Sequence, residues 1–182
     1  MKIMFISDIH GIKRNLDLIK EKYKELGCNK LVVLGDLYYI GPRNNRKEEY
    51  DINSVKIFLE SMKQDMICLR GNCDSDVDIE VSNFPIINEL GYISDKNNDI
   101  YLTHGHIYNE DNWNMPNTIL IYGHYHIPFI KEKDNMIFAN PGSISLPKNG
   151  YNPSYMIYDG EKLVIYDIFG NEIANKMIQI EK

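Results

Sequence analysis

Short apolar runs alternate with amphipathic stretches over the first part of the chain. The runs at 2–7, 30–34 and 66–69 are almost wholly apolar, which is typical of strands buried on both faces. The stretches at 13–26 and 51–63 repeat their apolar residues at helical spacing. This β-α-β-α-β order predicts a parallel sheet with right-handed crossovers.

The two predicted helices have recognisable ends. Gly27 follows the first helix as a stop residue, and Asp51 is placed to cap the second. Between the second strand and the second helix, residues 41–50 are polar, begin with Gly-Pro, and predict an exposed loop. The predicted apolar faces comprise Leu16, Ile19, Tyr23 and Leu26 in the first helix, and Ile52, Val55, Phe58, Leu59 and Met62 in the second.

The second half of the sequence has a different pattern. Residues 89–103 predict a strand, a turn and a second strand. Short β-rich runs, separated by Asn, Pro and Gly, follow at 118–122, 128–132, 135–140, 154–159, 162–170 and 172–180. We therefore expect a single α/β domain over residues 1–182, parallel at the start and increasingly antiparallel toward the end.

Composition narrows the class of protein. The 182 residues are 43% hydrophobic and 25% charged, as in ordinary globular proteins, and the net charge is −6. An acidic chain without a Lys/Arg-rich block does not resemble a protein that binds nucleic acids or membrane surfaces through basic residues. No apolar stretch approaches the length of a membrane span. Three cysteines without a C-x-x-C pair favour reduced thiols and a cytoplasmic location.

The candidate chemistry lies where apolar runs end. Sites in open α/β sheets form at the carboxyl ends of strands, and a glycine adjoins nearly every one of these run ends. Five runs end in residues that bind metals, which gives the candidate ligands Asp8, His10, Asp36, Asn72, His104, His124 and His126.

Two of these ends carry a pair of candidate ligands one residue apart. In extended backbone, residues i and i+2 point to the same side, so Asp8 and His10 can share one cluster, as can His124 and His126. The intervening Ile9 would face away from the cluster, as would Tyr125.

The donor set contains nitrogen and oxygen but no thiolate, which suits Mn²⁺, Fe²⁺, Zn²⁺ or Ni²⁺. Seven candidate ligands are too many for one ion and suit two. Asp36, which stands alone on its strand end, is the natural bridge between ions roughly 3.5–4 Å apart, and such a pair would clamp a phosphoryl group.

The motifs D-x-H, GD, GNCD, HGH and GH-x-H occur in that order between Asp8 and His126, and NPGS follows at 140–143. Together they resemble the calcineurin-like metallophosphoesterase superfamily, and within it the small bacterial and archaeal YfcE-type phosphodiesterases. The resemblance implies an α/β four-layer αββα sandwich, in which two mixed β-sheets are flanked by helices. It also implies two divalent metal ions, most often Mn²⁺, and hydrolysis of phosphodiester bonds by a metal-bridging hydroxide.

Carried over by position, the resemblance implies a ligand set for each ion. The first ion would be held by Asp8, His10, Asp36 and His126. The second would be held by Asp36, Asn72, His104 and His124.

The sequence departs from the wider superfamily at two positions. Cys73 follows Asn72 where a histidine is common, and a thiol is a poor substitute for imidazole near neutral pH. This substitution favours diesters with good leaving groups over monoesters, and Asp74 is a candidate to assist. Tyr125 replaces the usual threonine of GH-x-H, and we expect little consequence. The expected catalytic residues are thus Asp36, Asn72, His104, Cys73 and Asp74.

Four further residues are candidates to contact the substrate or support the ligands: His106, Arg43, Asn44 and Asn140. The alternatives are packing for His106, a solvated loop for Arg43 and Asn44, and a plain Pro-Gly turn beside Asn140. For the protein as a whole, the alternatives are a scaffold of the same fold, such as the retromer subunit, or a phosphomonoesterase. We expect a small phosphodiester as the substrate and no stable binding of nucleic acids or membranes. A small homo-oligomer is compatible with the sequence.

Overall fold

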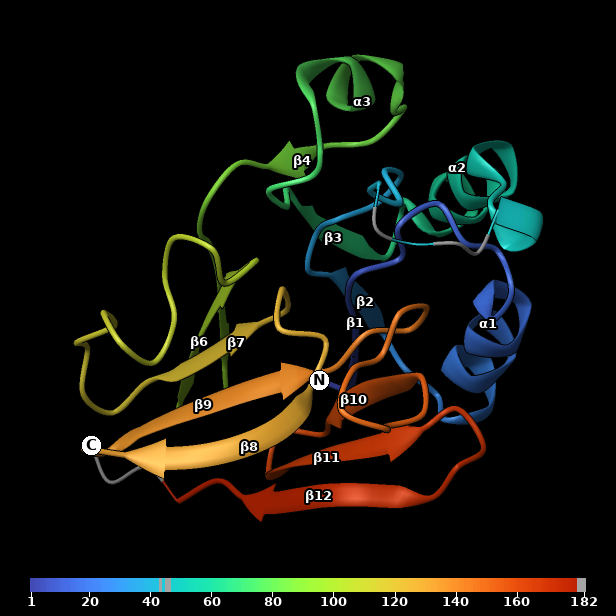
Figure 1. The fold of residues 1–182 in the computed structure, drawn as a ribbon. Coiled ribbons are helices and arrows are strands. Elements are labelled where there is room, and N and C mark those ends of the chain that lie inside the picture. Colours follow the sequence, from blue (N-terminus) through green and yellow to red (C-terminus); the bar gives the residue numbers. More distant parts are fainter. Residues whose placement is uncertain (43, 45–46, 180–182) are drawn as a thin grey trace.

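The computed structural model describes residues 1–42, 44 and 47–179, which form two β-sheets packed face to face (Figure 1). The first sheet contains β1 (Ile3–Ile6), β2 (Lys30–Val33), β3 (Met66–Leu69), β4 (Ile86–Ile87), β10 (Ser154–Tyr158), β11 (Lys162–Asp167) and β12 (Glu172–Met177). Its strand order is β12-β11-β10-β1-β2-β3-β4. The strands from β1 to β4 are parallel, and β10, β11 and β12 are antiparallel to their neighbours.

The second sheet contains β5 (Gly91–Asp95), β6 (Asn98–Thr103), β7 (Ile119–Tyr122), β8 (Pro128–Lys133) and β9 (Met136–Pro141). Its strand order is β5-β6-β7-β9-β8. The central pairs β6–β7 and β7–β9 are parallel, whereas the two edge strands are antiparallel. Both sheets are therefore mixed, as expected.

Two of the three helices in the described part of the chain, α1 (Leu16–Glu25) and α2 (Ile52–Met62), cover one face of the first sheet, whereas α3 (Asp76–Val81) buries none of its residues. A 3₁₀ turn, η1, spans Lys47–Glu49. Successive residues of β1 point to opposite faces, so Met4 and Ile6 pack against the helices whereas Ile3 and Phe5 pack against the second sheet. Burial on both faces explains why the strands of this sheet have continuous apolar sequences.

The outer face of the second sheet is covered differently. Trp113, from the segment between β6 and β7, packs there with Leu120, Tyr122 and Phe138. No helix covers this face among the described residues. The outer layer on this side is therefore made of loop.

Most of the predicted elements are present, with corrections. Ile52 is 41% exposed because it is the first residue of α2, so it does not belong to the buried face. The shift to antiparallel pairing holds for β10 to β12 but not for β6, β7 and β9, which are parallel. The short elements α3, β4 and η1 were not expected, because few residues define each of them.

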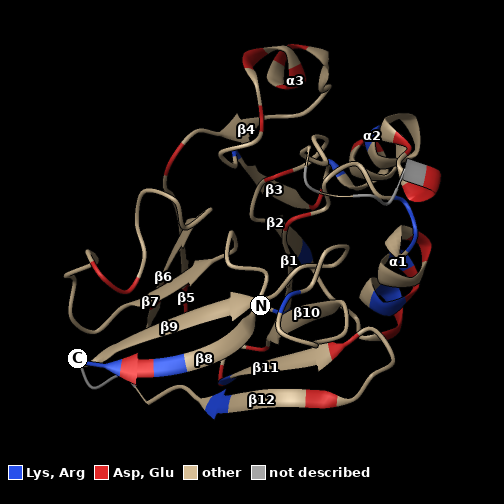
Figure 2. Ribbon diagram, in the orientation of Figure 1, with Lys and Arg blue, Asp and Glu red and all other residues tan. Residues whose placement is uncertain are grey.

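Charged residues are spread over many elements. In Figure 2, Lys and Arg occur on several helices and strands, while acidic residues are prominent on α3. Among the described residues, no helix is long and apolar enough to cross a membrane.

Candidate metal centre

The predicted ligands meet where strand ends of the two sheets come together. Within the first sheet, the Asp8 amide donates to the Gly35 carbonyl at 3.1 Å. Across the sheets, the His124 amide donates to Oδ2 of Asp8 at 3.0 Å. In the second sheet, the Gly123 amide donates to the His104 carbonyl at 2.9 Å. These bonds fix the loops that follow β1, β2, β6 and β7 against one another.

The backbone at the site is left-handed rather than extended. Positive φ angles between 53° and 66° occur at Asp8, His10, Asp36, His124 and His126. The expectation of extended backbone at the paired ligands was therefore wrong. Non-glycine residues adopt this conformation at a cost, and it persists where surrounding contacts enforce it, often at functional sites.

The sharp turns send His124 and His126 to different sides of the cluster. The His126 ring stacks on His10 with centroids 5.1 Å apart. The His124 ring lies edge-on to His104 with centroids 5.2 Å apart. Each of the two histidines thus joins a different group of side chains.

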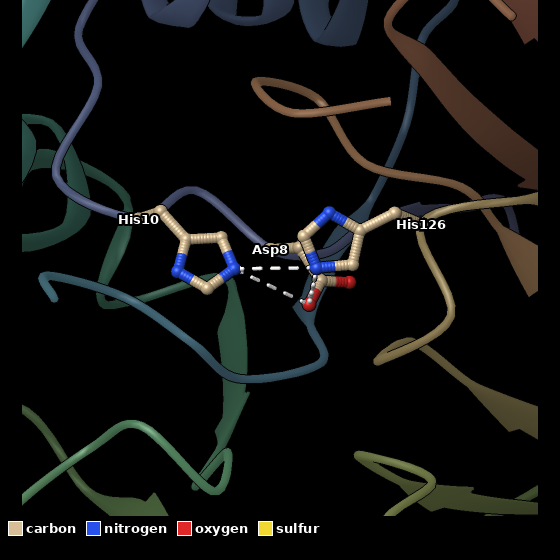
Figure 3. A group of neighbouring side chains, drawn as sticks. All are labelled: Asp8, His10 and His126. Carbon is tan, nitrogen blue, oxygen red and sulfur yellow. Dashed lines mark hydrogen bonds and ion pairs between the residues drawn. The ribbon is translucent and has the colours of Figure 1, made fainter. Parts of the chain in front are cut away.

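The first group consists of Asp8, His10 and His126 (Figure 3). The Nε2 atoms of the two histidines lie 3.3 Å apart, and Nε2 of His126 lies 3.3 Å from Oδ1 of Asp8. Nδ1 of His10 donates to the Tyr39 carbonyl at 2.6 Å, and Nδ1 of His126 donates to the Leu146 carbonyl at 2.7 Å. Because each Nδ1 donates to a carbonyl, each ring directs its Nε2 into the group, where it can bind a metal ion as a neutral imidazole.

The second group lies on the other side of Asp36. Oδ1 of Asp36 is 3.4 Å from Nε2 of His104, and its Oδ2 is 3.5 Å from Nε2 of His10. Nε2 of His104 is also 3.1 Å from Oδ1 of Asn72, while its Nδ1 donates to the Leu34 carbonyl at 2.6 Å. The two carboxylate oxygens of Asp36 therefore face the two groups separately.

In the cluster, the carboxylates of Asp8 and Asp36 and the charged ring of His104 stabilise one another. Burial raises the pKa of the Asp8 carboxyl, but the close contact with His126 and the charge of His104 outweigh it and lower this pKa below its usual value. The pKa of Asp36 is likewise lowered, because the interaction with His104 overcomes burial. Burial opposes the charged form of His104, but Asp36 and Asp8 raise its pKa to about 9. The pKa of His124 is lowered by burial and by the charge of His104, which favours its neutral form.

These features fit divalent cations. Oδ1 of Asp8 is buried, and it accepts no hydrogen bond within the described part of the chain. In the first group, two imidazole lone pairs and a carboxylate converge on one point, which is unfavourable without a cation between them. Nitrogen and carboxylate oxygen are the donors that first-row divalent metals prefer.

Cys73 contacts the centre through its backbone and through its thiol. Its amide donates to Oδ1 of Asp36 at 2.8 Å, and its Sγ accepts from Nδ2 of Asn72 at 3.3 Å. Burial and the charge of Asp36 raise the pKa of the Cys73 thiol to about 12. The side chain is therefore a neutral thiol near neutral pH.

The Asp74 carboxylate points away from the substrate side. Its oxygens accept hydrogen bonds from the backbone amides of Asp36, Leu37 and Gly71 at 2.9, 2.7 and 2.7 Å. It is 3% exposed and does not line the cavity over the centre. This geometry positions the backbone of Asp36 and gives no support to the expected role in leaving-group protonation.

A cavity of about 630 Å³ opens over the centre. The predicted ligands His10, Asp36, Asn72, His124 and His126 form its floor together with Cys73. Its walls are formed by Tyr39, Ile40, Gly41, Pro42, Asn44, Leu146, Pro147 and Lys148. Of these wall residues, only Asn44 was expected from the sequence. The others lack a metal-binding or motif signature, so no local pattern could have identified them.

The remaining sequence candidates lie in different places. His106 is exposed; its ring centroid lies 5.4 Å from that of His104 and 6.2 Å from that of His124, and the residue does not line the cavity. Asn44 lines the cavity and donates from Nδ2 to the Ile40 carbonyl at 2.5 Å. Arg43 lies outside the described residues.

Asn140 supports the loop that carries His124. It is fully buried and donates from Nδ2 to the Gly123 carbonyl at 2.6 Å, while its Oδ1 accepts from the Gly142 amide at 2.8 Å. It therefore has no access to a substrate, and its contact with the ligands runs through the backbone before His124.

Comparisons with known proteins agree with this geometry. The family model described as "Calcineurin-like phosphoesterase superfamily domain" matches residues 1–162. The Escherichia coli protein called phosphodiesterase YfcE is 37% identical over 169 residues, which cover 91% of each chain.

Solved structures give the same result for the fold. The structure of the E. coli phosphoesterase Yfce matches with a TM-score of 0.93 and 35% identity, covering 98% of this chain and 100% of that one. A structure of Vps29 from Entamoeba histolytica in complex with Zn²⁺ matches with a TM-score of 0.60 and 22% identity, covering 100% of both chains. The latter similarity is one of fold alone.

Proposed function

This chain belongs to the calcineurin-like phosphoesterase superfamily, and we propose that it hydrolyses phosphodiester bonds at a centre of two divalent metal ions. The observation that carries this proposal is the position of Asp36. One of its oxygens faces His10 in the first group of ligands, and the other faces His104 in the second. A single carboxylate placed in this way suits the bridge of a two-metal site.

The ligand sets follow from the two groups. Asp8, His10, Asp36 and His126 would hold the first ion. Asp36, Asn72, His104 and His124 would hold the second. We propose Mn²⁺ as the metal, with Ni²⁺, Fe²⁺ and Zn²⁺ as alternatives that the same nitrogen and oxygen donors accept.

When bound, the ions would lower the pKa of a bridging water to supply the nucleophile and would offset charge on the phosphoryl oxygens. The protein's own residues prepare the site for them. Carbonyl groups of Tyr39, Leu34 and Leu146 fix the tautomers of three ligand histidines. Asn72 lines the cavity floor beside Cys73, where a substrate phosphate would lie.

Cys73 makes diesters the preferred substrates. A neutral thiol with a pKa of about 12 is a much weaker acid than an imidazolium, so it gives little help to a poor leaving group. Small diesters with good leaving groups need that help least. We propose a cytoplasmic location for this activity, supported by the three free cysteines.

The test is hydrolysis of bis(p-nitrophenyl) phosphate by chelator-stripped protein with Mn²⁺ added back. We expect turnover that depends on Mn²⁺ and is lost in Asp36→Asn, together with bound Mn²⁺. Asp65→Asn, a change at an exposed carboxylate paired with Lys30, is the matched control and should retain turnover. Absence of turnover by the wild type with Mn²⁺, Ni²⁺, Fe²⁺ and Zn²⁺ would favour a scaffold of the same fold.

A phosphomonoesterase is the other alternative. It predicts faster hydrolysis of p-nitrophenyl phosphate than of the diester under the same conditions. The proposed function predicts the reverse order of kcat/KM.

A further inference from the structure

The cavity over the metal centre has two walls, and each is bonded to a different ligand histidine. On one side, the Tyr39 carbonyl accepts a hydrogen bond from His10. On the other side, the Leu146 carbonyl accepts from the His126 ring, and the Lys148 amide donates to the His126 carbonyl at 3.1 Å. Both walls are therefore held in a fixed position relative to the first group of ligands.

The side chains of these walls differ chemically from the floor. Most of the wall side chains are apolar. Tyr39 is 48% exposed, so its ring is accessible to a ligand in the cavity. Among the described lining residues, and with histidines neutral, Lys148 carries the only positive charge. Within the same described lining, the only negative charge is that of Asp36, which faces the histidines of the two groups.

The cavity is also larger than a phosphate group requires. Its volume of about 630 Å³ lies within the range of sites that bury a drug-sized ligand. The floor recognises the phosphate common to all phosphodiesters. Selection among phosphodiesters must therefore come from the walls, because these face the rest of the substrate.

We propose that Tyr39 and Lys148 form the subsite for the ester group of the substrate, and that they select an ester group with an aromatic ring and a second anionic group. The Tyr39 ring stacks on the aromatic ring, and the Lys148 ammonium pairs with the second anion. A nucleotide ester has this chemistry. The proposal rests on the phosphodiesterase function proposed above.

The role of Tyr39 is tested with two substrates that share a leaving group, bis(p-nitrophenyl) phosphate and methyl p-nitrophenyl phosphate. We expect the ratio of their kcat/KM values to fall roughly fivefold in Tyr39→Ala, the size of effect expected for one aromatic contact. Tyr39→Phe keeps the ring and should keep the ratio, as should Tyr92→Ala at an exposed tyrosine of β5. An unchanged ratio in Tyr39→Ala would overturn the role of Tyr39, since general damage lowers both values equally.

The role of Lys148 is tested by calorimetric binding of adenosine 5′-monophosphate and adenosine 3′,5′-bisphosphate to the Mn²⁺-loaded protein. We expect tighter binding of the bisphosphate, and a loss of roughly threefold to fivefold of that preference in Lys148→Ala, as for an exposed ion pair. Lys148→Arg should keep the preference, as should Lys133→Ala at an exposed lysine of β8. Equal affinities for the two nucleotides in the wild type would overturn the proposal.

The two proposals fail in different ways. Absence of Mn²⁺-dependent turnover contradicts the phosphodiesterase function, whereas nucleotide binding still reports on the subsite. Turnover without preference for the aromatic ester or the second phosphate contradicts the subsite alone.

Discussion

The carboxylate of Asp74 is hydrogen-bonded to the backbone of Asp36, whose amide donates to Oδ2 of Asp74 at 2.9 Å. The same carboxylate accepts from the amides of Leu37 and Gly71. Asp74 thereby joins the turn after β2 to the turn after β3. This bond network holds Asp36 in the left-handed conformation that directs its two oxygens to the two groups of ligands.

Substitution of Asp74 should therefore weaken metal binding. In Asp74→Asn, one acceptor oxygen becomes an N–H donor that faces another donor. We expect Mn²⁺ affinity to fall by about 10- to 100-fold, as for other changes behind metal ligands. Calorimetric titration with Mn²⁺ measures this directly. Asp76→Asn, at a carboxylate that is 92% exposed, is the control, and equal affinities of the two variants would contradict the positioning role.

Substitution of Gly71 should disturb the metal centre as much as substitution of Asp74, for a steric reason. A Cβ atom at this position would lie 2.1 Å from Oδ1 of Asp36, a distance that forces the carboxylate to move. We expect Gly71→Ala to lose Mn²⁺-dependent turnover. Gly91→Ala provides the comparison, because the nearest atom to its Cβ would be 3.4 Å away, and turnover there should persist. Retention of full activity in Gly71→Ala would show that the Asp36 position is not critical.

The metal-free protein should lose stability as the pH rises. The folded-state pKa of His104 is about 9, above its usual 6.5, because Asp36 and Asp8 favour the charged ring. This contribution to the free energy of unfolding is fully present below pH 6.5 and is lost as the pH rises through 9. His126 has a raised pKa as well and acts in the same direction.

Urea unfolding in the presence of a chelator, at a series of pH values from 6 to about 10, measures this loss. His104→Gln should reduce the pH dependence across that window. A free energy of unfolding that stays constant across it in the wild type would contradict the raised pKa values.

Asp51 should stabilise the start of α2 in a pH-dependent manner. Its side chain accepts from the Ser54 amide and pairs with Lys13, and these contacts lower its pKa to about 2. The stabilisation is present above the usual pKa of 3.8 and is lost as the pH falls through about 2. We expect a lower Tm for Asp51→Ala at pH 7, whereas Asp51→Asn keeps the cap and should lose less. Equal Tm values for the two variants would show that the cap contributes little.

The sequence by itself determined the strands of the first sheet other than the two-residue β4, together with the identity of the candidate ligands. Strands such as β1 and β2 are buried on both faces, so an apolar run predicts each of them without any knowledge of the neighbouring strands. The ligand types stood out because histidine, unlike asparagine or glycine, has no reason to gather at turns. Their order along the chain then indicated the family.

Tertiary structure decided how those residues are arranged. The left-handed turns that separate His124 from His126 depend on hydrogen bonds between the two sheets, such as that from His124 to Asp8, which no local pattern encodes. The same holds for the cavity walls, where Tyr39 and Lys148 line one cavity although they are far apart in sequence. The periodicity of apolar residues indicates whether a segment is a helix or a strand. Contacts between distant residues arise only when distant strands pair and bring their ends to one edge of a sheet.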